Sequence, residues 1–329
     1  MVMRTLVLGG TSFLSRTVAV DAVRRGHDVT CVARGKSGPF PDGVRPVVLD
    51  RGEPNALDAL RGERFDAVVD VATMTPGWVR DALQAFGAHA RHWTYVSSIN
   101  VYADTATPHQ TTDAPLLDPI PDPGERTMAE VTPEFYGAVE VAAENHVRDA
   151  VGERAFVVRP GQITGPGDYM RRFHYWPARF ARGGRVVVPD APGHPFQHVD
   201  VRDLAAWIVS AAEDGVTGTF DAVSPVADLG ETLREIAAST APAGTKLVPI
   251  APDVLVRAGV RPWAGDGSLP MWLPETHYGM VSHDARTAWA AGLAIRPLAD
   301  TVHAALADHR ASGGPLGGLT PEQERALLA

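Results

Sequence analysis

Hydrophobic residues in the first half of the chain occur in short runs that are separated by longer amphipathic stretches. The runs are continuous rather than alternating, which is typical of strands covered on both faces of a parallel sheet. The six runs are TLVLGG, DVTCVA, VRPVVLD, DAVVDVA, HWTYVSS and RAFVVRP. Amphipathic stretches with helical spacing lie between them, for example at 14–26 and 133–151. This alternation predicts an α/β fold with a doubly wound parallel sheet over residues 1–160, with a mixed α+β arrangement as the alternative.

The pattern loosens after Pro160. Segments rich in glycine and proline, such as RPGQITGPGDYMRR, VVVPDAPGHPF and GVRPWAGDGSLPMWLP, indicate loops, and DVRDLAAWIVSAAEDG and ADTVHAALADHR indicate helices. We therefore predict a smaller, irregular substrate-binding lobe over residues 161–329, which can return elements to the main sheet. A short terminal helix is expected after Thr320, opened by a capping box that reaches Gln323.

The composition and net charge of the chain limit the kinds of molecule that it is expected to bind. The chain has 329 residues, 45% of them hydrophobic, which is ample for a large core, and its formal net charge of −9 disfavours nucleic acid and anionic membranes as partners. Its single cysteine, Cys31, excludes an internal disulfide and fits a reducing cytoplasm. No apolar stretch approaches the length of a membrane span, and the histidine spacing indicates no metal site.

A glycine turn follows the first predicted strand. Thr5 to Leu8 forms the core of that strand, and a helix begins at Phe13, so strand, turn and helix come in the order that a pyrophosphate site requires. Backbone N–H groups at such a helix start can hold phosphate oxygens. The predicted phosphate contacts are Gly9, Gly10, Thr11, Ser12, Phe13 and Leu14. A structural turn without a ligand is the alternative.

The segments LVLGGTSFLS and RGHDVTCVARG together resemble the TGxxGxxG region of the extended short-chain dehydrogenase/reductases, the NAD-dependent epimerase/dehydratase-like family. The match is at Gly9, while Ser12 and Ser15 replace the two later glycines. The Ser12 hydroxyl can itself donate to a phosphate, and Ser15 is small enough for close packing of helix on strand. The resemblance implies a Rossmann-type fold and a nicotinamide dinucleotide.

The end of the second strand bears on the choice of cofactor. Where an NAD-specific site offers an acidic residue to the ribose, this chain has Arg34 and Lys36, which suit a 2′-phosphate. NADP(H) is therefore the preferred cofactor, with NAD(H) as the alternative, and a solvated basic loop is the structural alternative. The further cofactor contacts that the resemblance implies are Asp50, Arg51, Val71, Ala72, Ser97, Tyr136 and Pro160.

The segment YVSSINVY resembles the family's active-site strand, which implies that Ser98 binds the substrate carbonyl or hydroxyl. Downstream, Tyr136 and Glu140 occupy the first and last positions of the YxxxK motif, and their one-turn spacing places them on one helix face. The resemblance implies that Tyr136 is the catalytic acid/base. The lysine position of the motif is occupied by Glu140.

The lysine of the family holds the nicotinamide ribose and lowers the tyrosine pKa, and Glu140 inverts that charge. Loss of acid/base assistance costs about 10²- to 10⁴-fold in rate. Three interpretations remain open: Tyr136 acts only as a neutral donor in reduction; His174, His198 or a substrate atom moves the proton; or hydride transfer is lost. An exposed Glu140 on a misassigned helix register is the structural alternative.

The segment RPGQITGPGD resembles the part of the family that passes the nicotinamide, which implies that Pro160, Gly161 and Gln162 border the reacting atoms. Cationic and aromatic residues then gather at 171–179, which indicates either a pocket for an anionic or aromatic substrate or packing between the lobes. The predicted substrate contacts are Asn100, Gln162, His174 and Trp176.

The resulting hypothesis is an NADP(H)-dependent, reductase-like oxidoreductase that acts on a carbonyl, alcohol or imine of a small polar metabolite. One alternative is a nucleotide-sugar epimerase or dehydratase, and another is a catalytically degenerate cofactor-sensing or interaction protein. The resemblance also implies a homodimer that pairs through the helix at 133–151. The single cysteine favours a cytoplasmic location.

Overall fold

The computed structural model describes residues 1–124 and 130–329. Its centre is a seven-stranded sheet with the strand order β11-β6-β5-β4-β1-β2-β3 and parallel pairing throughout. The strands are β1 (Arg4–Leu8), β2 (Asp28–Ala33), β3 (Arg45–Val48), β4 (Ala67–Asp70), β5 (His92–Val96), β6 (Ala155–Pro160) and β11 (Gly218–Ala222). The order reverses between β1 and β4, so the sheet is doubly wound and the predicted Rossmann-type α/β fold is confirmed.

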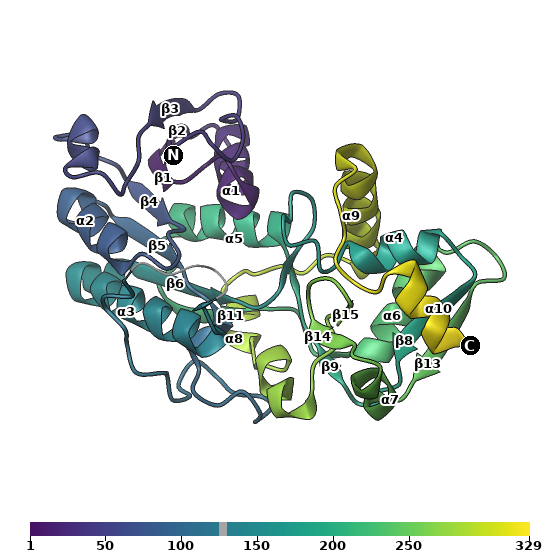
Figure 1. Ribbon diagram of the computed structural model, residues 1–329. Helices are drawn as coiled ribbons and strands as arrows, with labels where there is room; N and C mark the ends of the chain where they lie inside the picture. The colour runs from purple at the N-terminus through teal and green to yellow at the C-terminus, as the bar shows by residue number, and fades with distance from the viewer. Residues whose placement is uncertain (125–129) are drawn as a thin grey trace.

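Two pairs of helices cover the two faces of this sheet (Figure 1). Helices α1 (Phe13–Arg24) and α5 (Val201–Asp214) share one core, and α2 (Pro76–Phe86) and α3 (Pro133–Val151) share the other. Adjacent strand residues point into different cores, as Leu6 and Val7 do in β1. Both faces of the sheet are therefore buried, which explains why the hydrophobic runs in the sequence are continuous.

The seventh strand of the sheet comes from beyond residue 160. Strand β11 pairs with β6 along its whole length, from Gly218 opposite Phe156 to Ala222 opposite Pro160. Helix α5, which precedes β11, also belongs to the Rossmann half because it packs beside α1. The two halves of the sequence are thus interleaved at the sheet.

A second lobe with its own hydrophobic core lies at the end of the molecule away from the N-terminus (Figure 1). It contains α4 (Tyr175–Ala181), β8 (Arg185–Pro189), α6 (Leu229–Thr240), β13 (Lys246–Ile250), α7 (Pro252–Arg257), α9 (Leu298–Ser312) and α10 (Pro321–Leu328). The terminal helix begins as predicted, with the reciprocal capping box between Thr320 and Gln323.

The prediction of loops in this lobe is partly wrong. The segment VVVPDAPGHPF begins in strand β8, which pairs in parallel with β13 and buries four of its five residues. The segment GVRPWAGDGSLPMWLP contains the paired strands β14 (Arg261–Trp263) and β15 (Ser268–Pro270). Proline and glycine are tolerated here because each of these sheets has two strands, so every strand is an edge strand.

The remaining elements are short. They are β7 (Ile163–Thr164), β9 (Pro195–Phe196), β10 (Val199–Asp200), β12 (Ala227–Asp228), α8 (Arg286–Ala290) and the 3₁₀ turns η1 (Ala56–Leu60), η2 (Ile99–Val101), η4 (Gly152–Arg154) and η5 (Glu275–Val281). Among the described residues, no helix combines the length and the apolar character that crossing a membrane requires.

Candidate active site

The glycine turn after β1 is held by backbone conformation and close packing. Gly9 and Gly10 have φ angles of 142° and 109°, which residues with a side chain rarely adopt. A Cβ on Gly10 would lie 2.6 Å from the Cys31 Sγ, and one on Gly9 would lie 2.9 Å from the Ser15 Cβ. Ser15 therefore packs directly beneath the turn, where the family has its last glycine, and its hydroxyl donates to the Ser12 carbonyl oxygen at 2.8 Å.

The start of α1 fits a pyrophosphate. Ser12 is the N-cap of the helix, and within residues 1–124 and 130–329 its side chain makes no capping hydrogen bond. The N–H groups of the first turn are thus not satisfied by the cap, and the helix dipole favours an anion there. Thr11 and Leu14 are buried beside the turn, and Phe13 contacts the exposed Tyr169 edge-to-face at a centroid distance of 6.2 Å.

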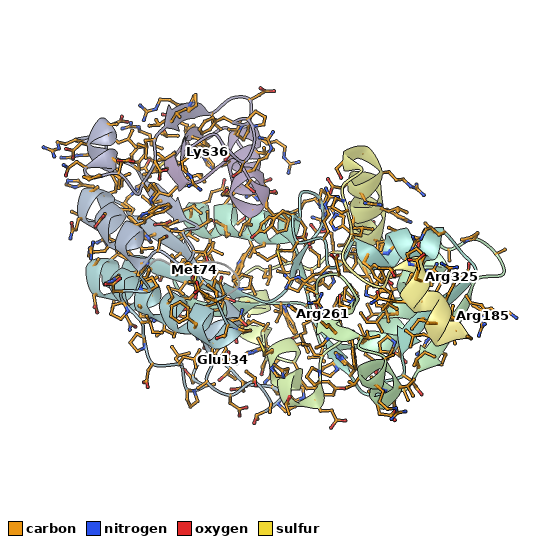
Figure 2. The ribbon with its side chains drawn as sticks, viewed as in Figure 1. Lys36, Met74, Glu134, Arg185, Arg261 and Arg325 are labelled. Carbon is orange, nitrogen blue, oxygen red and sulfur yellow. The ribbon has the colours of Figure 1, made fainter. Side chains whose placement is uncertain are left out.

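The adenosine end of the predicted site lies at the carboxyl ends of β2, β3 and β4. Arg34 and Lys36 are both exposed there, and Arg34 lies 3.8 Å from the Asp50 carboxylate. Figure 2 marks Lys36 in this part of the Rossmann half. Val71 and Ala72 follow β4, and the Val71 Cγ2 would lie 3.0 Å from a Cβ on Gly9.

The Arg51 side chain, a predicted cofactor contact, makes several hydrogen bonds within the protein. Its guanidinium makes a two-pronged ion pair with the buried Asp70 at 2.9 and 3.0 Å and donates to the Trp78 carbonyl oxygen at 2.6 Å. Its charge also lies over the Trp78 ring, 5.6 Å from the centroid. These contacts tie the carboxyl ends of β3 and β4 together.

Ser98 lies immediately after β5, as the N-cap of the turn η2. The backbone N–H and the side-chain amide of Asn100 donate to its Oγ at 3.2 and 3.0 Å. Because Asn100 occupies the lone pairs of this oxygen, the Ser98 proton is free to be donated to a neighbouring oxygen. Ser97 is buried beside it, and its backbone N–H donates to the Val158 carbonyl oxygen.

Tyr136 projects from the first turn of α3, a helix that begins at Pro133 with the Thr132 hydroxyl as its cap. Burial and the neighbouring Glu140 raise the pKa of the Tyr136 phenol well above its usual value, and the nearby hydroxyl groups of Thr73 and Ser98 oppose this shift. The structure thus brings the predicted pair Ser98 and Tyr136 together. It also adds Thr73, which lies outside every motif that the sequence displays.

Glu140 is buried, with 1% of its surface exposed, so the alternative of an exposed residue on a misassigned register is wrong. Its Oε1 accepts from the Thr73 hydroxyl at 3.0 Å and from the Met74 N–H at 3.2 Å. Its Oε2 accepts from the Tyr95 hydroxyl at 2.6 Å. Figure 2 marks Met74, which follows β4 on the side of the sheet that α3 covers.

The environment of Glu140 favours the protonated, uncharged form of its carboxyl group. Burial raises the pKa of the Glu140 carboxyl to about 7, although the donors on Tyr95, Met74 and Thr73 oppose the shift. Both oxygens are engaged within the protein, so this carboxylate is not free to take over the ribose contacts of the missing lysine. The nicotinamide end of the site is therefore built differently from the family pattern.

The histidines considered as alternative proton carriers are engaged elsewhere. His174 is fully buried and its Nε2 lies 3.1 Å from the Asp308 Oδ2. His198 contacts the Thr164 hydroxyl at 2.9 Å, and burial lowers the pKa of His198 to about 4. A histidine held in its neutral form across physiological pH is a poor proton source.

On the substrate side, Pro160 ends β6 and Gln162 follows it. Gln162 is only 4% exposed, and among the described residues neither its amide oxygen nor its amide nitrogen has a hydrogen-bond partner. An unsatisfied buried amide is costly, and it suggests a polar group that binds there. Trp176 does not fit the predicted substrate role, because it is fully buried in the second-lobe core and donates to the Pro270 carbonyl oxygen. His174 is also fully buried, and among the described residues its Nδ1 has no hydrogen-bond partner.

Arg172, in the cationic segment, interacts electrostatically with Tyr136. Its guanidinium carbon is 4.7 Å from the centroid of the Trp263 ring. Burial lowers the pKa of Arg172, and the charges of Asp168, Tyr169 and Tyr136 oppose that shift. In the part of the chain that the structure describes, its Nε has no hydrogen-bond partner. This arginine is therefore available to an anionic or polar substrate group.

A buried polar network joins β6, α3, β11 and the segment that follows β5. The Arg159 guanidinium pairs with Glu144 on α3 and donates to the Tyr102 hydroxyl at 2.8 Å. Tyr102 in turn donates to Asp221 at 2.6 Å, and His283 contacts the other oxygen of Asp221 at 3.1 Å. Among the described residues, no group of three or more His, Cys, Asp or Glu side chains is arranged so that it could hold a metal ion.

Residues 5–222 of the chain match the NAD-dependent epimerase/dehydratase family. Over 199 residues the chain is 30% identical to 2′-dehydrokanamycin reductase of Streptomyces kanamyceticus, an alignment that covers 57% of this chain and 52% of that protein. Over 218 residues it is 26% identical to a chloroplast stem-loop binding protein of Arabidopsis thaliana, covering 61% of this chain and 53% of that protein. The chain thus spans about half the length of these two relatives.

Among solved structures, the fold is similar to that of the Bordetella bronchiseptica enzyme WbmH, which was solved in complex with NAD+. The TM-score is 0.67 at 16% identity, and the match covers 95% of this chain and 100% of that chain. At 16% identity, this structural similarity supports the assignment of the fold alone.

Proposed function

We propose that this chain, which belongs to the NAD-dependent epimerase/dehydratase family, is an NADP(H)-dependent reductase that acts on a carbonyl or imine of a small polar metabolite. Family membership makes it an NAD(P)-dependent oxidoreductase-type enzyme. The direction of the reaction, the choice of cofactor and the substrate class are the finer parts of the proposal.

The observation that carries the direction is the neutral phenol of Tyr136 beside Ser98. Reduction needs a protonated donor at the carbonyl oxygen, whereas oxidation of an alcohol begins with a phenolate. Burial and Glu140 both disfavour the phenolate. An epimerase that starts by oxidising its substrate would work against this electrostatic environment, and so reduction is favoured.

The residues at the phosphate end fit a nicotinamide dinucleotide. When bound, the reduced nicotinamide supplies the hydride. The glycine turn and the uncapped start of α1 would hold the pyrophosphate, and a Cβ on Gly10 would collide with Cys31. Arg34 and Lys36 would bind the 2′-phosphate of NADP(H), because both are exposed cations beyond the end of β2.

Ser98 would bind the substrate oxygen, with its Oγ oriented by Asn100. Gln162 would contribute an amide and Arg172 a positive charge, which favours a substrate with hydroxyl, amino or anionic groups. The Streptomyces kanamyceticus relative is named as a reductase, which agrees with this direction.

The test is consumption of NADPH by the wild-type protein with a panel of small ketones, aldehydes and imines that carry hydroxyl or amino groups. We expect turnover of at least one class, with a loss of about 10²-fold or more in Ser98→Ala. Ser282→Ala, which removes a buried hydroxyl that donates to the Tyr278 carbonyl oxygen, is the matched control. Salt-dependent retention on stem-loop RNA without any turnover would contradict the proposal and favour an interaction role.

A further inference from the structure

Residues 72–75 form the segment that follows the carboxyl end of β4. Strand β4 pairs with β1 on one side and with β5 on the other. The strand order reverses between β1 and β4, and in doubly wound sheets a ligand binds outside the carboxyl ends of the strands at such a point. The segment 72–75 therefore borders the crevice in which the proposed cofactor lies.

The order of the strands also separates the two halves of the dinucleotide. The cations Arg34 and Lys36 follow β2, on one side of β1, whereas Ser98 follows β5, on the other side. The segment 72–75 lies on the side of Ser98. With the adenosine end held beyond β2, as proposed above, the nicotinamide half passes this segment on its way to Ser98.

Hydrogen bonds from α3 and β5 hold the segment from inside the fold. The Glu140 Oε1 accepts from the Thr73 hydroxyl at 3.0 Å and from the Met74 N–H at 3.2 Å. The Tyr95 hydroxyl contacts the Ala72 carbonyl oxygen at 3.2 Å and the Glu140 Oε2 at 2.6 Å. Both Glu140 and Tyr95 are buried. These two side chains form a clamp on the segment.

The backbone of Met74 shows that the clamp holds a conformation that is unfavourable by itself. The φ angle of Met74 is 61°, in the left-handed region that residues with a side chain rarely adopt. Such a backbone persists only where the surrounding contacts determine it. The Met74 N–H donates to Glu140, so the clamp acts directly on the strained residue, which Figure 2 marks. Loss of the Glu140 oxygen would release it.

The clamp also orients the Thr73 hydroxyl. A hydroxyl has one proton to donate, and here that proton goes to Glu140. The Thr73 oxygen keeps acceptor capacity for another donor, and Thr73 is exposed, whereas the clamp is buried. A ligand in the crevice would therefore meet an acceptor whose orientation is already fixed.

We propose that Glu140 is a positioning residue for the nicotinamide half of the cofactor. With Tyr95 it holds residues 72–75 in the conformation that binds this half, and Thr73 accepts a hydrogen bond from one of its hydroxyl or amide groups. The inference rests on the proposed reductase function, because it specifies how the same site binds its cofactor. A segment that is already ordered loses less freedom when the ligand binds, which raises the affinity.

The test is calorimetric binding of NADPH and of adenosine 2′,5′-bisphosphate, which carries the adenosine and the 2′-phosphate but no nicotinamide. Glu140→Met has a similar length but no oxygen acceptor. We expect it to lower the affinity for NADPH roughly tenfold and to leave the affinity for the bisphosphate within about twofold of wild type. Glu140→Gln keeps a carbonyl oxygen for Thr73 and Met74, so it should bind NADPH as the wild type does.

Thr73→Val tests the same proposal without a change in the buried clamp, and it decides the question if Glu140→Met does not fold. We expect a selective loss of NADPH affinity in this variant, and Thr73→Ser, which keeps the hydroxyl, should restore the affinity. Thr245→Val is the matched control, because it removes a hydroxyl that donates to the Pro242 carbonyl oxygen in the second lobe.

Wild-type affinity for NADPH in Thr73→Val and in a folded Glu140→Met would overturn the inference and leave the reductase intact. Equal losses for NADPH and for the bisphosphate would also overturn it, because the clamp would then support the fold as a whole. If the wild type binds neither ligand, the proposed reductase fails and the inference fails with it. That result is distinct from the first two, in which the wild type binds NADPH.

Discussion

The two ends of the predicted dinucleotide site differ in how closely they follow the family pattern. At the pyrophosphate end, Ser12 and Ser15 replace two glycines, yet Gly9 and Gly10 keep the left-handed backbone of the turn and Ser15 fits beneath it. At the nicotinamide end, one replacement, Glu140, accepts hydrogen bonds from three residues on two segments: Thr73 and Met74 after β4, and Tyr95 in β5. The pyrophosphate end tolerates small substitutions because it binds the cofactor through backbone N–H groups. The nicotinamide end acts through side-chain charge.

This difference predicts where substitutions matter most. Changes to the glycine turn should affect binding of the cofactor, because that end holds the pyrophosphate. Changes around Tyr136 should affect the chemical step and its pH dependence, because that end supplies the proton.

Tyr136→Phe removes the proton donor at the substrate oxygen. We expect kcat to fall by about 10²- to 10⁴-fold while the affinity for cofactor changes little, since loss of a general acid acts on the transition state. Tyr278→Phe, whose ring packs against His194 at a centroid distance of 4.6 Å, is the control and should remain close to wild type. If the affinity for the cofactor fell by the same factor as kcat, this would contradict the role of Tyr136 as the proton donor.

Glu140→Gln should change how stability depends on pH. The pKa of Glu140 rises from 4.5 in the unfolded chain to about 7 in the fold, so between these values the folded state binds more protons than the unfolded state. The free energy of unfolding of the wild type therefore falls as pH rises through this window. Relative to wild type, the variant should gain about 3 kcal/mol between pH 4.5 and pH 7.5.

Urea denaturation at a series of pH values measures this difference. Both proteins share all other ionisable groups, so their difference isolates the titration of Glu140. A difference in unfolding free energy that is constant with pH would contradict the buried carboxyl as described.

Gly10→Ala should disturb the pyrophosphate end. Its φ of 109° and the 2.6 Å approach to the Cys31 Sγ predict about 1–3 kcal/mol of strain in the turn. Relief of this strain displaces the backbone N–H groups that hold the pyrophosphate, so we expect roughly a 5- to 150-fold loss of NADPH affinity. Gly26→Ala is the matched control, because Gly26 also has a positive φ, of 87°, but a Cβ there would meet no described atom within 4 Å. Thermal unfolding of both variants separates lost affinity from lost stability.

Arg34→Gln should change cofactor preference with the smallest effect of the four. We expect a roughly tenfold loss of NADPH affinity and little change for NADH, because one phosphate contact of about 1.4 kcal/mol is removed. Arg61→Gln, whose exposed side chain pairs with Asp58, is the control for loss of a surface charge. Equal losses for NADPH and NADH would place Arg34 away from the 2′-phosphate.

The sequence predicts the Rossmann sheet well because its signal is local and strong. Each of the six hydrophobic runs is a strand, and helix α3 has the bounds of the amphipathic stretch at 133–151. Helix α2 has a weaker signal, since the glycine at position 77 and the preceding threonines dilute its helical pattern. The loop prediction at β8 is wrong because Pro189 and Gly193 indicate a loop, whereas the strand itself offers a run of only three valines.

The site is predictable where the motif supplies the contact, and not where the contact comes from tertiary packing. Ser98 and Tyr136 come together as the motif implies. The donation from Tyr95 to Glu140 joins a strand interior to a helix, and no spacing in the sequence indicates it. Thr73 has one usable signal, since it is a hydroxyl residue just beyond the carboxyl end of a parallel strand.

The most direct test of the account is a titration of the purified wild-type protein with NADPH and with NADH at matched ionic strength, followed by nicotinamide fluorescence. We predict saturable binding of both, with the tighter binding for NADPH. Tighter binding of NADH would contradict the role of Arg34 and Lys36, and binding of neither would contradict the dinucleotide site and the reductase that we build on it.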